Sequence, residues 1–464
     1  METKLYFYHS NDLHSNLGQW PKMMDYFESA RALHEQKHEA AMFFDIGDHV
    51  DRSHPITESS LGKFNVELMN LAGYDFVTFG NNEGITLPHE SLDSLYEEAN
   101  FTVLGANLYD VDGTRPDWVK PYGVKELEGG IKAGVIGVTV PFKSFYRQLG
   151  WKVEDPFEML QDLIMEVREK ADIIILLSHL GMNDDRRIAE QMAGIDIILG
   201  GHTHHLLKNG EYVNGTLIGQ AGKFGHYVGQ VAVTYDLEEG KITDKKAWAV
   251  PVDNMEGNQK AFFELQRLEN ESKIMLSETI TELDEPLPVD WYGETRFASL
   301  LADGLKDWCS AEASMVNAGV LLSGLGKGPV SKADIHKVCP HPINPCKVEL
   351  PGDKLSEVIH QAFTDDMQGL KIRGLGFRGK VMGRMVFSGI DVKTKKMADG
   401  LTHVTEIKVN GNPIDGDRMY EIATVDMFTF GPLYPEISHS PKKRYYMPEM
   451  LRDVLTWQLG RVFG

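Results

Sequence analysis

Residues 41–53 read AMFFDIGDHVDRS and place an aspartate directly behind an apolar run. The run 41–44 predicts a buried strand, and Gly47 precedes Asp48 where the chain leaves it. Glycine allows a tight turn that brings the carboxylate close to a cation. The two oxygens of Asp48 can bridge two cations. A Gly-Asp pair alone is weak evidence because aspartate is common in turns, so its weight comes from four further strand ends of the same kind.

Bulk properties limit the class of protein. A chain of 464 residues is too long for one core and favours two domains. The formal net charge of -21 argues against binding a nucleic-acid polymer, because such a chain repels phosphate backbones. The 3 cysteines give no disulfide framework. The sequence shows neither a signal-peptide pattern nor a bilayer-length apolar run, so we expect a cytoplasmic protein without membrane contact. No pattern indicates an oligomeric state.

The first half alternates apolar runs with amphipathic stretches, which predicts βαβ units and an α/β fold. The expected strands are 5–8, 42–44, 76–79, 102–104, 135–138, 173–177, 195–199, 216–218, 230–235 and 247–252. The expected helices between them include 21–35, 60–72 and 156–169.

The composition of the sequence changes after residue 253. Residues 254–283 are polar with helical spacing, which predicts a linker helix; the alternative is a surface helix of the first domain. Beyond it we expect helices at 296–308 and 352–363 and a strand at 314–316. The predicted organisation is a first domain of residues 1–253, a linker at 254–286 and a smaller α/β domain at 287–464.

Five expected strand ends carry polar residues of related chemistry. They are Asn11-Asp12-Leu13-His14, Gly47-Asp48, Gly80-Asn81-Asn82-Glu83, Ser178-His179 and Gly200-Gly201-His202-Thr203-His204-His205. In open α/β sheets, sites form beyond the carboxyl ends of the strands, so these clusters should converge.

The spacing within these clusters suits metal binding. In an extended chain, residues i and i+2 point the same way, so Asp12 and His14 can share a cation. His202 and His204 can also share one, or each can serve one of two adjacent cations. The seven predicted ligands are Asp12, His14, Asp48, Asn81, His179, His202 and His204. With Asp48 shared, they supply two sites of four ligands each. Imidazole, carboxylate and amide oxygen together suit Mn, Zn, Fe or Co better than Ca or Mg. Each histidine taken alone is more often an ordinary buried or surface residue.

The order Asp-x-His, Gly-Asp, Gly-Asn, His and Gly-His-x-His resembles the calcineurin-like metallophosphoesterases. Residues 104–108, LGANL, and the second half narrow the resemblance to the 5′-nucleotidase and UDP-sugar hydrolase family. The resemblance implies a four-layer αββα metallophosphoesterase domain followed by a 5′-nucleotidase-type specificity domain. It places Asp12, His14, Asp48 and His204 on one metal, and Asp48, Asn81, His179 and His202 on the other. Such a pair generates a hydroxide nucleophile and clamps phosphate oxygens.

The sequence departs from the family motif after the third strand. The family reads Gly-Asn-His-Glu-x-Asp, but Asn82 stands at the histidine and Ile85 at the aspartate. The amide of Asn82 can donate to an oxyanion but cannot act as an acid. Three alternatives stay open: a substitute histidine, substrates with good leaving groups, or weak activity. The candidate substitutes are His49, His205 and His226.

The second half also departs. The family's Asn-x-Gly-Ile-Arg segment reads Asn317-Ala318-Gly319-Val320-Leu321, so its substrate-contacting arginine is absent. A basic, glycine-rich stretch at 373–380 offers compensation, because backbone N–H groups and arginine forks can hold an anion. The alternative is an exposed turn. Arg52 could add a cation beside the phosphate, or pair with a neighbouring acid. The predicted substrate-binding residues are Arg373, Phe377, Arg378, Arg384, Phe430 and Tyr434.

These features predict a dimetal phosphoesterase that hydrolyses a nucleotide phosphomonoester, with Asp48 and Asn82 as catalytic residues and a small nucleotide as its partner. The enzymatic alternatives are a nucleotide pyrophosphohydrolase and a cyclic phosphodiesterase. The alternative from another class is a catalytically weakened nucleotide-binding protein.

Overall fold

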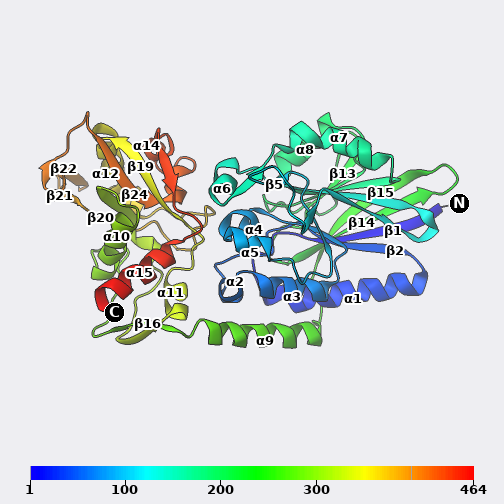
Figure 1. Cartoon of the computed structure of the whole chain (residues 1–464), viewed down its shortest axis with the longest axis horizontal. Coiled ribbons are helices and arrows are strands. Elements are labelled where there is room, and N and C mark those ends of the chain that lie inside the picture. The colour runs from blue at the N-terminus through cyan, green and yellow to red at the C-terminus, as the bar shows by residue number, and fades with distance from the viewer. Residues whose placement is uncertain (1, 399) are drawn as a thin grey trace. The chain divides into compact units, whose positions relative to one another are not determined.

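The computed structural model describes residues 2–398 and 400–464 (Figure 1). The chain forms two compact units, Met1–Ser272 and Lys273–Gly464, referred to below as unit 1 and unit 2.

Two sheets form the centre of unit 1. The first runs β15 (Lys241–Pro251), β14 (Tyr227–Asp236), β1 (Glu2–Ser10), β2 (Ala40–Asp45), β3 (Phe76–Thr78), β4 (Thr102–Leu104) and β6 (Val119–Lys120). The second runs β12 (Glu211–Val213), β13 (Thr216–Gly219), β11 (Ile197–Gly200), β10 (Ile173–His179), β8 (Lys132–Thr139) and β7 (Tyr122–Glu126). Phe7 and Phe44 of the first sheet share one core with Ile175 and Leu199 of the second. All ten expected strands lie in these sheets; β6, β7 and β12 were not foreseen.

Helices cover the outer face of each sheet. α7 (Pro156–Arg168) and α8 (Met182–Gln191) pack on β8, β10 and β11 in an apolar cluster that includes Leu160 and Ile188. On the other side lie α1 (Trp20–Lys37) and α3 (Lys63–Ala72) (Figure 1). Phe27 of α1 contacts Phe43 of β2, with ring centroids 5.3 Å apart. Unit 1 therefore has the four αββα layers that the sequence predicts.

Short elements complete unit 1. They are η1 (Leu17–Gln19), α2 (Pro55–Ser60), α4 (Asn81–Thr86), α5 (His89–Asp93), β5 (Leu108–Asp110), η2 (Glu128–Gly130), α6 (Lys143–Gln148), β9 (Trp151–Val153) and α9 (Gln259–Met275).

The segment expected as one linker helix is divided. Only Gln259–Met275 is helical, and α9 contacts the rest of unit 1 through the Ser59–Ser272 hydroxyl pair at 2.9 Å. Residues 279–283 instead form β16 (Thr279–Leu283), which pairs with β18 (Gly328–Ser331) in unit 2. The helical expectation for 279–283 was wrong because strand pairing outweighs local helix propensity there.

A five-stranded sheet organises unit 2. Its order is β20 (Met385–Ser388), β17 (Ala313–Asn317), β24 (Met419–Val425), β19 (Pro345–Pro351) and β25 (Lys443–Tyr445). The helices are α10 (Arg296–Trp308), α11 (Lys332–Val338), α12 (Gly352–Ala362), α13 (Asp365–Gln368), α14 (Pro435–Ser438) and α15 (Leu451–Phe463), with η3 (Ala318–Val320) and η4 (Asp426–Thr429). A separate sheet holds β21 (Ile390–Lys396), β22 (Thr402–Val409) and β23 (Asn412–Pro413).

Candidate metal centre

Strand register brings the predicted ligand loops of unit 1 to one edge. β1 and β2 are parallel with Ser10 opposite Asp45, so the loops that carry Asp12 and Asp48 leave the sheet side by side. The backbone N–H of Asp12 donates to the carbonyl of Gly47 at 3.0 Å, and that of His14 donates to the carbonyl of Asp48 at 2.7 Å. In the second sheet, β10 and β11 are parallel with Ser178 opposite Gly200. His179 and the His202–His204 loop therefore also follow one sheet edge.

The backbone at these loops is strained. Five of the seven predicted ligands have a positive φ, a conformation that costs energy for residues other than glycine. They are Asp12 (53°), His14 (49°), Asp48 (52°), His202 (70°) and His204 (56°). Strain concentrated on ligand-type side chains indicates a functional site, because the fold has to hold them against local preference.

Two glycines allow the loops to approach. A Cβ on Gly47, whose φ is 88°, would lie 2.4 Å from the backbone nitrogen of Gly80. A Cβ on Gly80 would lie 2.1 Å from Asp48 Oδ1 and 2.6 Å from the His179 ring. Only glycine fits at either position, so the tight turn expected at Gly47 has a direct physical cause.

The predicted histidine and carboxylate ligands gather into two groups. One is Asp12, His14 and His204, and the other is Asp48, His179 and His202; within each, the donor atoms lie within 4.8 Å of one another. Asp48 Oδ2 lies 3.6 Å from His14 Nε2 and 3.4 Å from His179 Nε2, so the aspartate faces both groups. This division matches the two sites that the family resemblance implies.

Two buried atoms test whether cations fit here. Asn81 Oδ1 and His179 Nε2 make no hydrogen bond with the described residues. Leaving buried polar atoms unsatisfied is costly unless a ligand completes them. His179 belongs to the second group, to which the family resemblance also assigns Asn81, and an imidazole nitrogen and an amide oxygen suit a divalent cation. The residues present therefore fit a pair of metal ions.

Charge at the centre follows from burial and from neighbours. Burial would raise the pKa of Asp48, but His179 and His14 outweigh it and lower that pKa. Burial lowers the pKa of His202 to about 4, so its imidazole is neutral at pH 7, the form that binds metals.

Asn82, the predicted catalytic residue, is held at the bridging carboxylate. Its side-chain nitrogen donates to Asp48 Oδ2 at 2.8 Å, and its backbone N–H donates to Asp48 Oδ1 at 2.8 Å. Of the possible substitute histidines, His49 is buried beside Trp20, with ring centroids 5.4 Å apart. Burial lowers the pKa of His49 to about 3. His205 is exposed and bonds Thr203 Oγ1 at 2.9 Å, and His226 is exposed.

Arg52 pairs with an acid, as in the alternative given for it above. Its guanidinium binds both carboxylate oxygens of Glu58, at 2.8 and 3.0 Å, and donates to the carbonyl of Thr86. Arg52 is only 6% exposed, so the structure favours this pairing over the suggested phosphate contact.

The structure also shows a role for Glu83 that the sequence analysis missed. Its carboxylate is 1% exposed and accepts three backbone N–H groups, those of Asp48, Val50 and Gly80, at 3.0, 2.9 and 2.8 Å. Glu83 thereby joins the loops that follow β2 and β3. The signal was an acidic residue in the first turn of α4, where such a side chain can reach back to free backbone donors.

In unit 2, the predicted substrate residues occupy different environments. Arg373 and Arg378 are exposed on the loop at 370–383. Phe377 is 4% exposed and stacks on His341 at 5.3 Å, and Tyr434 is fully buried against Phe428. Stacking of either ring on a base would therefore require it to leave its packing.

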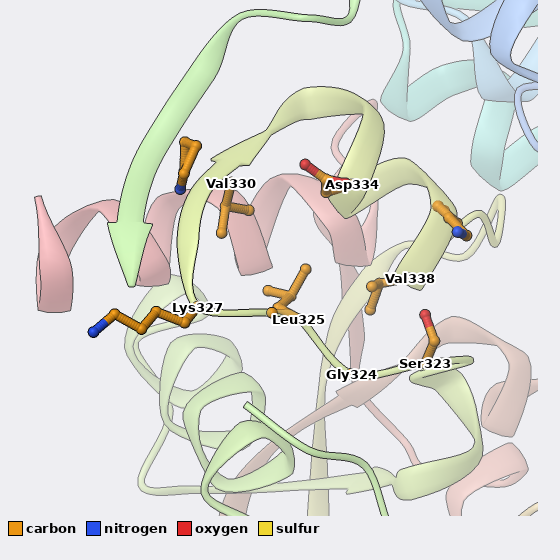
Figure 2. A pocket seen from close by; sticks show the side chains of 10 residues that line it. Ser323, Gly324, Leu325, Lys327, Val330, Asp334 and Val338 are labelled. Atoms are coloured by element: carbon orange, nitrogen blue, oxygen red, sulfur yellow. The ribbon is translucent and has the colours of Figure 1, made fainter. Parts of the chain in front are cut away.

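The other two predicted substrate residues, Arg384 and Phe430, and one cavity also lie in unit 2. Arg384 pairs with Glu294, and Phe430 is half-buried. Figure 2 shows a separate cavity of about 240 Å³ beside α11, lined by residues that include Leu325, Lys327 and Val338. None of the six predicted substrate residues lines it.

Comparison with family models gives two matches. Residues 5–206 match the calcineurin-like phosphoesterase model, and residues 278–431 match the 5′-nucleotidase C-terminal domain model. The first match lies within unit 1 and the second within unit 2.

Individual proteins extend this similarity. The chain is 47% identical over 464 residues to the uncharacterized metallophosphoesterase YunD of Bacillus subtilis, covering 99% of this chain and 100% of YunD. It is 27% identical to the trifunctional nucleotide phosphoesterase protein YfkN of Bacillus subtilis, over 78% of this chain but only 28% of YfkN. The solved structure of Haemophilus influenzae NAD nucleotidase (NadN) has the same fold, with a TM-score of 0.69 at 17% identity, covering 99% of this chain and 96% of NadN.

Across the described part of the chain, every helix falls short of the length and apolar character that crossing a membrane requires.

Proposed function

The chain belongs to the calcineurin-like phosphoesterases, a family of hydrolases that use two divalent metals, and from that premise we propose that it hydrolyses a nucleotide phosphomonoester, as 5′-nucleotidases do. The observation that carries the proposal is the pair of donor groups facing Asp48. A 5′-nucleotidase-type C-terminal domain in the same chain supports a small nucleotide as the substrate class.

The residues of unit 1 divide the work. Divalent metals bound here would lower the pKa of a coordinated water and clamp phosphate oxygens. Asp48 faces both donor groups, and Asn82 keeps that carboxylate oriented through two hydrogen bonds. The amide of Asn82 can also donate to a phosphate oxygen, but it cannot protonate a leaving group. We assign the metals to Mn, Zn, Fe or Co because the donors mix imidazole with oxygen.

In unit 2, we assign substrate contacts to the exposed Arg373 and Arg378. Arginine presents a planar fork that matches phosphate geometry. The chain is otherwise strongly acidic, with a net charge of -21, so an anionic substrate needs such local cations.

Two enzymatic alternatives share the same centre. A nucleotide pyrophosphohydrolase or cyclic phosphodiesterase is favoured by Asn82 and Ile85, since no acid stands at the family position. An anhydride expels a stable phosphate anion and depends less on general acid help. A weakened nucleotide-binding protein is the remaining candidate.

The test is a screen for product release from the manganese-loaded protein. We expect phosphate and nucleoside from a nucleoside monophosphate. Loss of at least about 10²-fold in kcat is expected for Asp48→Asn, because the shared carboxylate is removed. Asp155→Asn is the control, since Asp155 caps α7 by accepting from Phe157 N at 3.0 Å. Products from dinucleotides or cyclic nucleotides alone would favour the alternatives. No product from any nucleotide, with both metals bound, would favour the binding protein.

A further inference from the structure

The two donor groups differ in charge. The first contains Asp12 as a carboxylate of its own, with His14 and His204. The second contains Asp48, which also faces the first group, with the imidazoles of His179 and His202. The family resemblance adds to it only the neutral amide of Asn81. A divalent cation is held more strongly where more negative charge surrounds it. The site of Asp12, His14 and His204 should therefore be the tighter one.

A further carboxylate stands behind His14. Its Nε2 points to the metal ligands, 3.0 Å from His204 Nε2 and 3.6 Å from Asp48 Oδ2. On the opposite side of the ring, Nδ1 lies 3.5 Å from Asp51 Oδ2 and 3.3 Å from Asn82 Nδ2, which also donates to Asp48 Oδ2 at 2.8 Å. Of these two neighbours only Asp51 is a charged acceptor, and a carboxylate favours a proton on Nδ1. Metal-binding histidines commonly place their second ring nitrogen on a carboxylate, which fixes the tautomer and makes the ligand more basic.

Asp51 is itself firmly held. It is 1% exposed; its Oδ1 accepts the backbone N–H of Ser53 at 2.8 Å, and its own backbone N–H donates to Ser15 Oγ at 2.8 Å. Ser15 in turn bonds Thr57 at 2.6 Å and Asn65 at 3.0 Å. This buried network leaves the carboxylate little freedom to turn away from His14.

The second site lacks an equivalent feature at its buried histidine. His179 Nδ1 lies 2.7 Å from the carbonyl oxygen of Ile46, a neutral acceptor. A carboxylate stabilises a donor more than a carbonyl does. The carboxylate beside His14 and the carbonyl beside His179 thus favour tighter binding at the first site, in addition to the greater negative charge of its ligands.

We propose that Asp51 is a positioning residue that holds His14 with its proton on Nδ1 and so makes the Asp12–His14–His204 site the tighter of two unequal cation sites. Of residues 51–53, the sequence analysis considered only Arg52. The proposal depends on the metal centre and not on the nucleotide substrate. A protein that hydrolyses no nucleotide would refute the proposed function and leave this proposal standing.

Calorimetric titration of the apoprotein with Mn²⁺ tests it. The wild type should bind two ions with dissociation constants at least about tenfold apart. Asp51→Asn keeps an oxygen for Ser53 but turns an NH₂ group toward His14 Nδ1. That donor favours the tautomer whose proton occupies Nε2, the metal-binding atom. The tighter site should weaken by about 10- to 100-fold, and the weaker site should change by less than about threefold.

Asp155→Asn is the matched control, because Asp155 also accepts the N–H two residues ahead and lies outside both donor groups. It should titrate like the wild type. Two equal sites in the wild type, an unchanged tight site in Asp51→Asn, or equal weakening of both sites would overturn the proposal.

A second measurement is made on the wild type and does not require the Asp51→Asn variant to fold. In the zinc-loaded wild type labelled with ¹⁵N-histidine, His14 should show metal at Nε2 and a proton on Nδ1. His14→Gln identifies the signal. Metal at Nδ1 would refute the proposal directly.

Discussion

Asn82 occupies the position at which the family has a histidine, and its side chain donates to the carboxylate that faces both donor groups. Asn82→His should raise kcat for adenosine monophosphate by about ten- to a hundredfold, the lower part of the roughly 10²–10⁴ range for general acid–base help, because Ile85 gives the new ring no aspartate partner. Steady-state kinetics with Mn²⁺ measure it. Asn82→Gln, which supplies no acid, should show no gain.

The same variant separates two explanations of the missing acid. With p-nitrophenyl phosphate, whose leaving group needs no proton, Asn82→His should give little change. If kcat for adenosine monophosphate does not rise either, the missing acid does not limit the rate.

At the scale of elements, the strand ends β1, β2, β3, β10 and β11 set the centre, and Glu83 of α4 holds two of their loops together. Glu83→Gln should lower the free energy of unfolding by about 2–3 kcal/mol, because glutamine has one acceptor oxygen for three backbone donors. Urea unfolding measures it. Glu90→Gln, at an exposed position of α5, should stay within about 0.5 kcal/mol of the wild type. An equally small effect at Glu83 would show that the loops hold without it.

The same elements show what the sequence could reveal. Apolar runs predicted ten strands of unit 1, because strands buried on both faces, such as β10, must be apolar whatever their partners. β14 alternates and β15 is mostly exposed, so their runs were shorter than the strands. The positions of the ligands at strand ends predicted that they converge, whereas their division into two groups came from the family resemblance, and His202 and His204 lie in different groups. The roles of Glu83 and Asp51 and the burial of Tyr434 depend on contacts between distant segments. Local pattern signals only the contact of Glu83 with Gly80 at the start of α4 and carries no information about the contacts with distant segments, and for the same reason it misassigned 279–283.

At the scale of the whole molecule, each unit has its own core and its own response to solution conditions. In unit 2, burial raises the pKa of Asp426 to about 7. An acid with a raised folded pKa binds more protons folded than unfolded, so stability is greatest below about pH 4 for this group and falls until about pH 7. The loss is on the order of 3–4 kcal/mol. Asp426→Asn should flatten the dependence of the unit 2 melting temperature on pH between 4 and 7, as scanning calorimetry would show. An unchanged slope would mean that Asp426 is not its source.

Metal removal should act on the other unit. All seven predicted ligands lie in Met1–Ser272, so cations that bind only the folded state stabilise unit 1 by about 2.7 kcal/mol at a free concentration 100 times the dissociation constant. In calorimetry, removing Mn²⁺ with EDTA should lower the temperature of the unit 1 transition and leave the temperature of the unit 2 transition unchanged. Asp426→Asn identifies the unit 2 transition, because only that transition should respond to the Asp426 substitution.

His179→Gln removes one ligand and should reduce the shift that EDTA causes in the unit 1 transition, whereas His336→Gln in unit 2 should leave this shift unchanged. A shift of both transitions together would show that the units unfold as one, and no shift at all would refute the metal centre from which the proposed activity follows.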